Sequence, residues 1–136
     1  MEDWKIKISV LWLFAAVAFL AHQILVLLEP GTIAQIMAGE VEGVKIGPAL
    51  ILAFALLMLV PLVMAFLSLT LKDSMNSWAN IIVGAVFAAI WFVGVVDAVA
   101  LSVWGGALLT LSAVVASALI VWYAWKSQQL ESYQGT

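Results

Sequence analysis

Residues 48–71 read PALILAFALLMLVPLVMAFLSLTL and carry no charged side chain. At about 1.5 Å of rise per residue, a helix of this length crosses the ~30 Å hydrocarbon core of a bilayer. Similar stretches cover about 6–28, 77–100 and 106–126. A soluble domain of this size could not bury so much apolar surface, so lipid must be its solvent. We therefore predict a single all-α domain over 1–136, a polytopic four-helix bundle in the cell membrane.

The composition narrows the range of functions. Hydrophobic residues make up 66% of the chain and charged residues 10%, against roughly 25% charged in soluble domains. There are five basic residues, all lysine, and no cysteine. A basic surface for nucleic acid is therefore missing, as are thiolate ligands. We expect no nucleic-acid partner, no metal and no cofactor.

Enzyme motifs are also missing from the sequence. It contains no nucleophile elbow, no phosphate-binding loop and no zinc-protease helix. We assign no catalytic residue, and no motif in the sequence argues for an enzyme.

The lysines predict how the chain is oriented. Those before the first stretch, between the second and third, and after the fourth are Lys5, Lys7, Lys72 and Lys126. Lys45 alone lies in the loop 29–47 on the other side. Because short cytoplasmic loops are enriched in lysine, both termini are predicted to be cytoplasmic.

The first loop is long enough to hold structure of its own. Residues 32–39 place apolar side chains at the spacing of a short amphipathic helix. Thr32 is predicted to cap its start and Gly39 to end it. We expect this helix to lie on the outer surface or to cover the bundle as a lid.

Two further features concern the shape and packing of the helices. Pro61, in the middle of the second stretch, is expected to kink that helix. Small residues recur four apart in the last two stretches, as in Gly84 and Ala88, which lets helix backbones approach closely. Such seams either seal a bundle or join two copies, so a homodimer is one expectation.

Ionisable groups inside a membrane span are costly, and two of them stand out. His22 lies in the first stretch and Asp97 in the third. Glu29 follows His22 by seven residues and so shares its helix face. The predicted orientation gathers the candidate ligand-binding residues His22, Gln23, Glu29 and Asp97 in the outer half, below Glu40 and Glu42 of the loop. The alternative is that the loop acids are solvated and that His22 satisfies a buried partner.

A second polar group lies toward the opposite side of the membrane. Asn76 and Asn80 share one helix face, and Ser68 lies near the end of the preceding stretch. Hydrogen bonds between helices account for such residues, so we predict that they serve helix packing.

Four segments resemble those of a known family. They are Glu29 to Gly39, Val60-Pro61-Leu62 with Met64, Leu67 and Ser68, the run Trp78 to Gly84, and Trp122 to Lys126. Together they resemble a family of small four-span prokaryotic membrane proteins, a domain of unknown function. The resemblance implies the bundle fold over most of the chain and implies no activity.

The chain departs from the pattern of that family at three places. Val60 stands where its members tend to have an acid, and Ser77 where they tend to have a base. Gln23 lies where an aspartate is usual. Functional residues of the family can therefore not be assigned to these three positions. In particular, the second helix lacks the intramembrane carboxylate that the family pattern would place there.

Three functions remain open from the sequence. The first is a non-enzymatic bundle that binds a lipid, a small apolar ligand or a protein partner through the outer polar pocket. The second is a small dimeric transporter or channel that uses Asp97 and His22 as coupling groups. The third is a lipid-modifying enzyme built on His22, Glu29 and Asp97.

Overall fold

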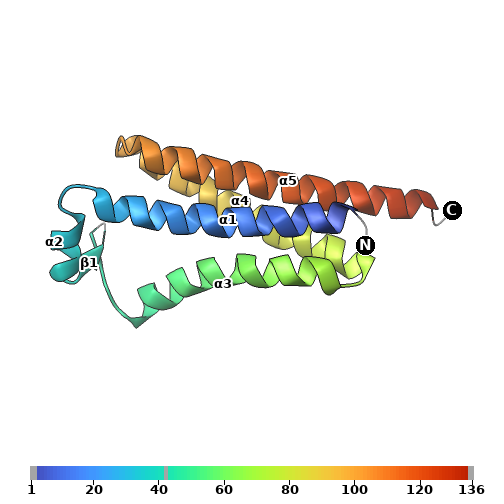
Figure 1. Cartoon of the computed structure of the whole chain (residues 1–136), viewed down its shortest axis with the longest axis horizontal. Coiled ribbons are helices and arrows are strands. Elements are labelled where there is room, and N and C mark those ends of the chain that lie inside the picture. Colours follow the sequence, from blue (N-terminus) through green and yellow to red (C-terminus); the bar gives the residue numbers. More distant parts are fainter. Residues whose placement is uncertain (1–2, 42, 135–136) are drawn as a thin grey trace.

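Four long helices lie side by side along the length of the molecule (Figure 1). The structure is a computed structural model that describes residues 3–41 and 43–134. The helices are α1 (Asp3–Leu28), α3 (Pro48–Thr70), α4 (Asp73–Ala100) and α5 (Trp104–Gln134). Each is long and apolar enough to cross a membrane, which confirms the prediction of a bundle of four apolar helices.

The two ends of the bundle differ. Both chain termini and the turn from α3 to α4 lie at one end, which we call the terminal end (Figure 1). The link from α4 to α5 lies at the other end, together with the short helix α2 (Thr32–Met37) and a small hairpin. We call this the loop end.

Three of the long helices extend beyond the predicted apolar stretches. Helices α1 and α4 begin at Asp3 and Asp73, each with an acid in its first turn, where the helix dipole favours negative charge. Helix α5 continues past the predicted limit at residue 126 to Gln134. The added residues include glutamine, leucine and glutamate, which have a high helix propensity in water.

The short helix of the first loop forms where it was expected, but one cap prediction was wrong. Gly31, not Thr32, is the N-cap of α2, and no side chain caps it. Gly31 has φ +86°, a left-handed conformation that suits glycine, so the chain turns before Thr32 and leaves it inside the helix. At the other end Gly39 has φ +87°, and its N–H donates to the Ile36 carbonyl at 2.9 Å, as predicted for the helix end.

A small hairpin follows, which the sequence analysis did not anticipate. Strands β1 (Glu40–Val41) and β2 (Val44–Lys45) pair antiparallel, with Glu40 opposite Lys45. The turn between them contains Gly43 at φ +77° and Glu42, which lies outside the described residues.

The centre of the bundle is filled by aromatic rings from α1 and α4. Trp12 meets Phe87 edge to face at 5.7 Å between ring centroids, and Phe19 lies 5.1 Å from Trp91. All four side chains are buried. Trp12 and Trp91 therefore pack inside the bundle.

Helices α4 and α5 approach each other closely at Gly84. A Cβ atom there would lie 3.0 Å from a Val121 methyl and 3.2 Å from an Ile120 methyl. Facing small residues Ala113 and Ser117 of α5 are buried. This small-residue seam therefore seals the bundle internally.

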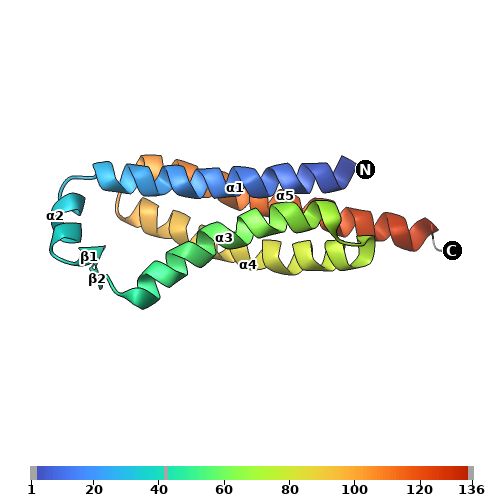
Figure 2. The same ribbon diagram turned by 60° about the horizontal axis from the view of Figure 1, so that its bottom comes forward.

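Helix α3 leaves the bundle gradually. Figure 2 shows it running beside α4 at the terminal end and diverging from α4 toward the loop end. It packs chiefly on α1. The helix is continuous through the buried Pro61, and most of its loop-end half is exposed. The short turn makes α3 and α4 antiparallel, but they are close neighbours only near that turn.

Candidate ligand-binding site

The polar residues at the loop end continue the buried face of α1. That face follows a spacing of three and four residues through Ile8, Trp12, Ala15 and Phe19. The same spacing leads to His22, Val26 and Glu29. His22 therefore occupies the inward face of α1 where the aromatic core ends. Glu29 was expected to share this helix face, but α1 ends at Leu28 and Glu29 lies in the bend that follows.

On α4 the inward face changes size at the same level. After the buried Trp91, the positions of the next turns hold Gly94, Ala98 and Leu101. Small residues replace rings here, and α3 has already diverged from α4 (Figure 2). The result is a cavity of about 490 Å³ between α1, α2 and α4, which we call the loop-end cavity.

The cavity brings together most of the residues singled out from the sequence. His22, Glu29 and Asp97 all line it. The lining does not include Gln23, a half-buried residue of α1, or Glu40, which is exposed on the hairpin. Glu42 falls outside the described residues.

Two polar lining residues were missed by the sequence analysis. Thr32 and Gln35 face the cavity from α2, three residues apart on one side of that short helix. The amphipathic spacing of residues 32–39 was the signal that could have found them. That spacing predicted the helix but not what its polar side would meet.

The charge of the cavity is negative. Its lining holds the carboxylates of Glu29 and Asp97 and no lysine. The negative ends of the α1 and α4 dipoles lie beside it, while α5 begins there with its positive end. These dipoles partly cancel, so the two carboxylates determine the sign of the electrostatic potential in the cavity.

Gly106 of α5 makes room for His22. A Cβ atom on Gly106 would lie 3.0 Å from Cε1 and 3.2 Å from Nδ1 of the imidazole. The ring therefore packs directly on the α5 backbone. Beside carboxylates, an imidazole can exchange a proton with a ligand.

The arrangement suits binding better than metal chemistry. Among the residues in 3–41 and 43–134, no group of three or more histidine, aspartate or glutamate side chains could hold a metal ion together. What remains is a partly open cavity with apolar walls and a few convergent polar groups, the usual character of a small-molecule site.

At the terminal end, the second predicted polar group forms a buried network around Asn80. The Asn80 Oδ1 atom accepts from Trp12 Nε1 at 2.7 Å and from Ser68 Oγ at 3.2 Å. Its Nδ2 atom donates to Oδ1 and to the carbonyl of Asn76, at 2.7 and 2.9 Å. The Asn76 amide donates in turn to the Ser68 carbonyl at 2.7 Å.

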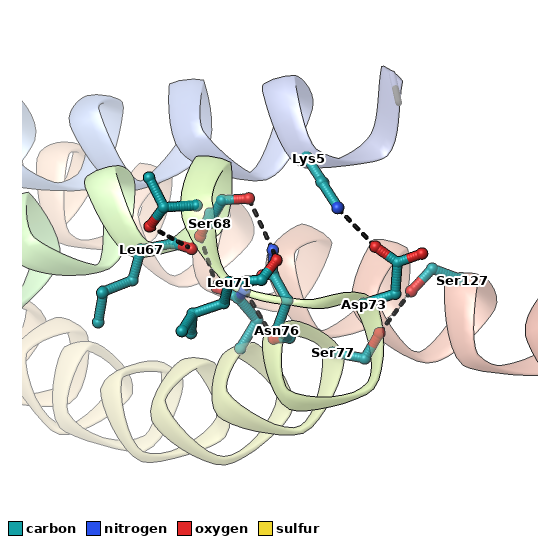
Figure 3. A network of polar contacts seen from close by, with 10 residues as sticks. Lys5, Leu67, Ser68, Leu71, Asp73, Asn76, Ser77 and Ser127 are labelled. Atoms are coloured by element: carbon teal, nitrogen blue, oxygen red, sulfur yellow. Dashed lines mark hydrogen bonds and ion pairs between the residues drawn. The ribbon is translucent and has the colours of Figure 1, made fainter. Parts of the chain in front are cut away.

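This network joins α1, α3 and α4. Figure 3 shows its members Ser68 and Asn76 beside the α3–α4 turn. Asn76, Asn80 and Ser68 are fully buried, and each is hydrogen-bonded. Two further contacts reach across the same end, Ser77 to Ser127 at 2.8 Å and the ion pair of Lys5 with Asp73. The terminal end is therefore cross-linked by polar contacts, whereas the loop end contains the cavity.

A separate hollow lies on the outside of the bundle between α1 and α5. It has a volume of about 410 Å³ and an apolar wall that includes Leu11, Phe14 and Leu108. The one hydroxyl in its lining, Ser112, donates to the carbonyl of Leu109 in its own helix. Bilayer chains can contact this surface without any polar recognition.

Comparison with known proteins identifies the family. A family model described as "Family of unknown function (DUF6326)" matches residues 1–132. The chain belongs to this family. No curated protein and no solved structure matches it. The resemblance stated from the sequence is thereby confirmed, and DUF6326 brings no activity with it.

Proposed function

We propose that this DUF6326 protein is a non-enzymatic membrane protein that binds a small amphiphilic molecule in the loop-end cavity. The observation that carries the proposal is the convergence of His22, Glu29 and Asp97 on one cavity of about 490 Å³. Gly94 and Ala98 provide the space, and α2 covers it with two more polar side chains. A polar end beside apolar walls suits a molecule with a polar head and an apolar body.

The orientation predicted from the lysines would place this cavity in the outer half of the membrane. Both termini would then be cytoplasmic, and α2 and the hairpin would lie outside. A ligand could reach the cavity from the outer leaflet or from the outer water layer.

The packing of the core supports binding over transport. The rings of Phe19 and Trp91 lie next to each other and directly precede the cavity residues along the chain in both helices, on the side of the terminal end. A transporter or channel that used Asp97 and His22 would need a polar path past this buried aromatic layer. In the described conformation that layer separates the polar loop end from the polar terminal end.

Filling the cavity tests the proposal. Ala98 is buried in the cavity wall, so Ala98→Leu places added carbon atoms in the space for the ligand. Ala89, also on α4, is exposed, which makes Ala89→Leu the matched control. The measurement is native mass spectrometry of each protein released from lipid nanodiscs made from the membranes of its host.

We expect a discrete non-covalent adduct on the wild type and on Ala89→Leu, and its loss from Ala98→Leu. An adduct that persists in Ala98→Leu at wild-type occupancy would show that the cavity is not the binding site. A wild type that carries no adduct would argue against a binding function.

A further inference from the structure

We infer that the ligand of the loop-end cavity is a cationic amphiphile, an aliphatic amine whose ammonium group lies between Glu29 and Asp97. We further infer that its apolar tail lies along the exposed face of α4. This inference rests on the proposed function and adds to it the chemical class of the ligand.

The charge of the lining selects the head group. Two carboxylates with no lysine among the lining residues attract a cation and repel an anion. A phosphate would find no lysine or arginine there, and the imidazole of His22 is the one basic side chain of the lining, against two carboxylates. An ammonium group has three donors, and besides the carboxylates it meets the Thr32 hydroxyl and the Gln35 amide as acceptors.

The membrane setting strengthens this preference. Carboxylates near the hydrocarbon boundary are costly to hold without a counter-charge. Lys45, the described lysine of the loop end, lies opposite Glu40 in the hairpin register and does not line the cavity. A bound cation would therefore supply the charge that the surrounding protein does not.

The tail is placed by the helix face that contains Asp97. Val86, Ile90 and Val93 precede Asp97 at spacings of four, three and four residues, so all four lie on one side of α4. These three apolar side chains are 52%, 37% and 65% exposed. From Val86 to Asp97 the helix rises about 16 Å, a length along which a dodecyl chain can lie.

Helix α3 leaves this face open. It diverges from α4 toward the loop end (Figure 2), so it does not cover the apolar stripe that leads to Asp97. Among the described residues from Val86 to Asp97 on α4, Asp97 is the one that carries a charge, and it lines the cavity at the end of the stripe. A molecule that slides along α4 in the membrane thus brings an amine head to the carboxylates.

The experiment compares probes that differ only in the head group. Wild-type protein in phosphatidylcholine nanodiscs is titrated calorimetrically with dodecylamine, dodecanol or dodecanoate, and empty nanodiscs give the partitioning background. Butylamine tests the need for a tail. Competition by phosphatidylethanolamine distinguishes a free amine from the amine of a phospholipid head group.

Variants that remove single carboxylates test whether the charge of the cavity binds the head group. Asp97→Asn and Glu29→Gln remove one charge each, and Glu40→Gln removes a carboxylate that does not line the cavity. We expect saturable binding of dodecylamine that weakens roughly 10- to 100-fold in each of the first two variants, the range for a lost hydrogen bond to a charged group. Glu40→Gln should bind as the wild type does, and dodecanol, dodecanoate and butylamine should bind far more weakly.

Equal binding of dodecanol and dodecylamine, both lost in Ala98→Leu, would overturn the inference about charge and leave the proposed function standing. Wild-type affinity for dodecylamine in a folded Asp97→Asn and Glu29→Gln double variant would also overturn it. Butylamine that binds as tightly as dodecylamine would overturn the placement of the tail. Displacement by phosphatidylethanolamine would contradict the exclusion of phosphate, and no saturable binding of any probe would count against the proposed function itself.

Discussion

Replacing Asn80 with alanine tests whether the buried polar network holds the terminal end together. Asn80 has no exposed surface and takes part in four hydrogen bonds. The Ser68 hydroxyl has one proton and also donates to the Met64 carbonyl at 2.6 Å, so it keeps a partner in Asn80→Ala. Three bonds are then lost outright, one from Trp12 and two to Asn76.

The expected loss of stability follows from those three bonds. Hydrogen bonds within membrane bundles average about 0.6 kcal/mol and reach about 1.7 kcal/mol. Three of them therefore give roughly 2 to 5 kcal/mol, before any cost of the volume removed. The assay is reversible unfolding in mixed detergent micelles, with the free energy of unfolding compared between variants.

Thr70→Ala is the matched control, because the Thr70 hydroxyl is exposed and donates within its own helix. It should change the free energy of unfolding by less than about 0.5 kcal/mol. Trp12→Phe removes the indole N–H. A double-mutant cycle that combines it with Asn80→Ala should give a coupling free energy between the two residues of about 0.6 to 1.7 kcal/mol. A loss below about 0.5 kcal/mol in Asn80→Ala, or a coupling near zero, would refute the assignment of a stabilising role to this network.

Further expectations concern the α4–α5 seam, the histidine and the orientation. Gly84→Leu should lower the free energy of unfolding by about 1 to 3 kcal/mol, because even a Cβ there would lie 3.0 Å from a methyl of α5; wild-type stability would contradict the close approach. Gly106→Ala should displace the ring of His22 and weaken dodecylamine binding in the same calorimetric assay, and unchanged affinity would show that the position of the ring is unimportant. Val44→Cys should react with an impermeant thiol reagent only from outside the cell and Ser74→Cys only from inside, since the chain has no other cysteine; the reverse labelling would invert the orientation.

The sequence was sufficient for the helices because their signals are local. A long apolar stretch defines a span by its length alone, whichever neighbours it packs against. Ser68 lies within hydrogen-bonding distance of Asn80 because a tight turn brings the ends of α3 and α4 together. In each case the distance along the chain fixes the distance in space.

The remaining features depend on packing between helices, which no single stretch of the sequence determines. The loop-end cavity exists because Gly94 and Ala98 of α4 face α1 where α3 has diverged, and no single stretch encodes that divergence. The same limit explains why the contacts of Gln35 and the hydrogen bond from Trp12 to Asn80 were not foreseen. Both join residues far apart in the sequence, across helices whose rotation about their axes is set by the whole bundle.

The most direct test of an open, acidic loop-end cavity uses a cysteine at Ala98. Ala98→Cys in nanodiscs is exposed to two small methanethiosulfonate reagents, one with an ammonium group and one with a sulfonate, and Ala113→Cys in the buried α4–α5 seam serves as the control. The account predicts reaction at Ala98→Cys but not at Ala113→Cys, with the cationic reagent faster and its advantage reduced when Asp97→Asn is added. Failure of Ala98→Cys to react, or equal rates for the two reagents, would contradict it.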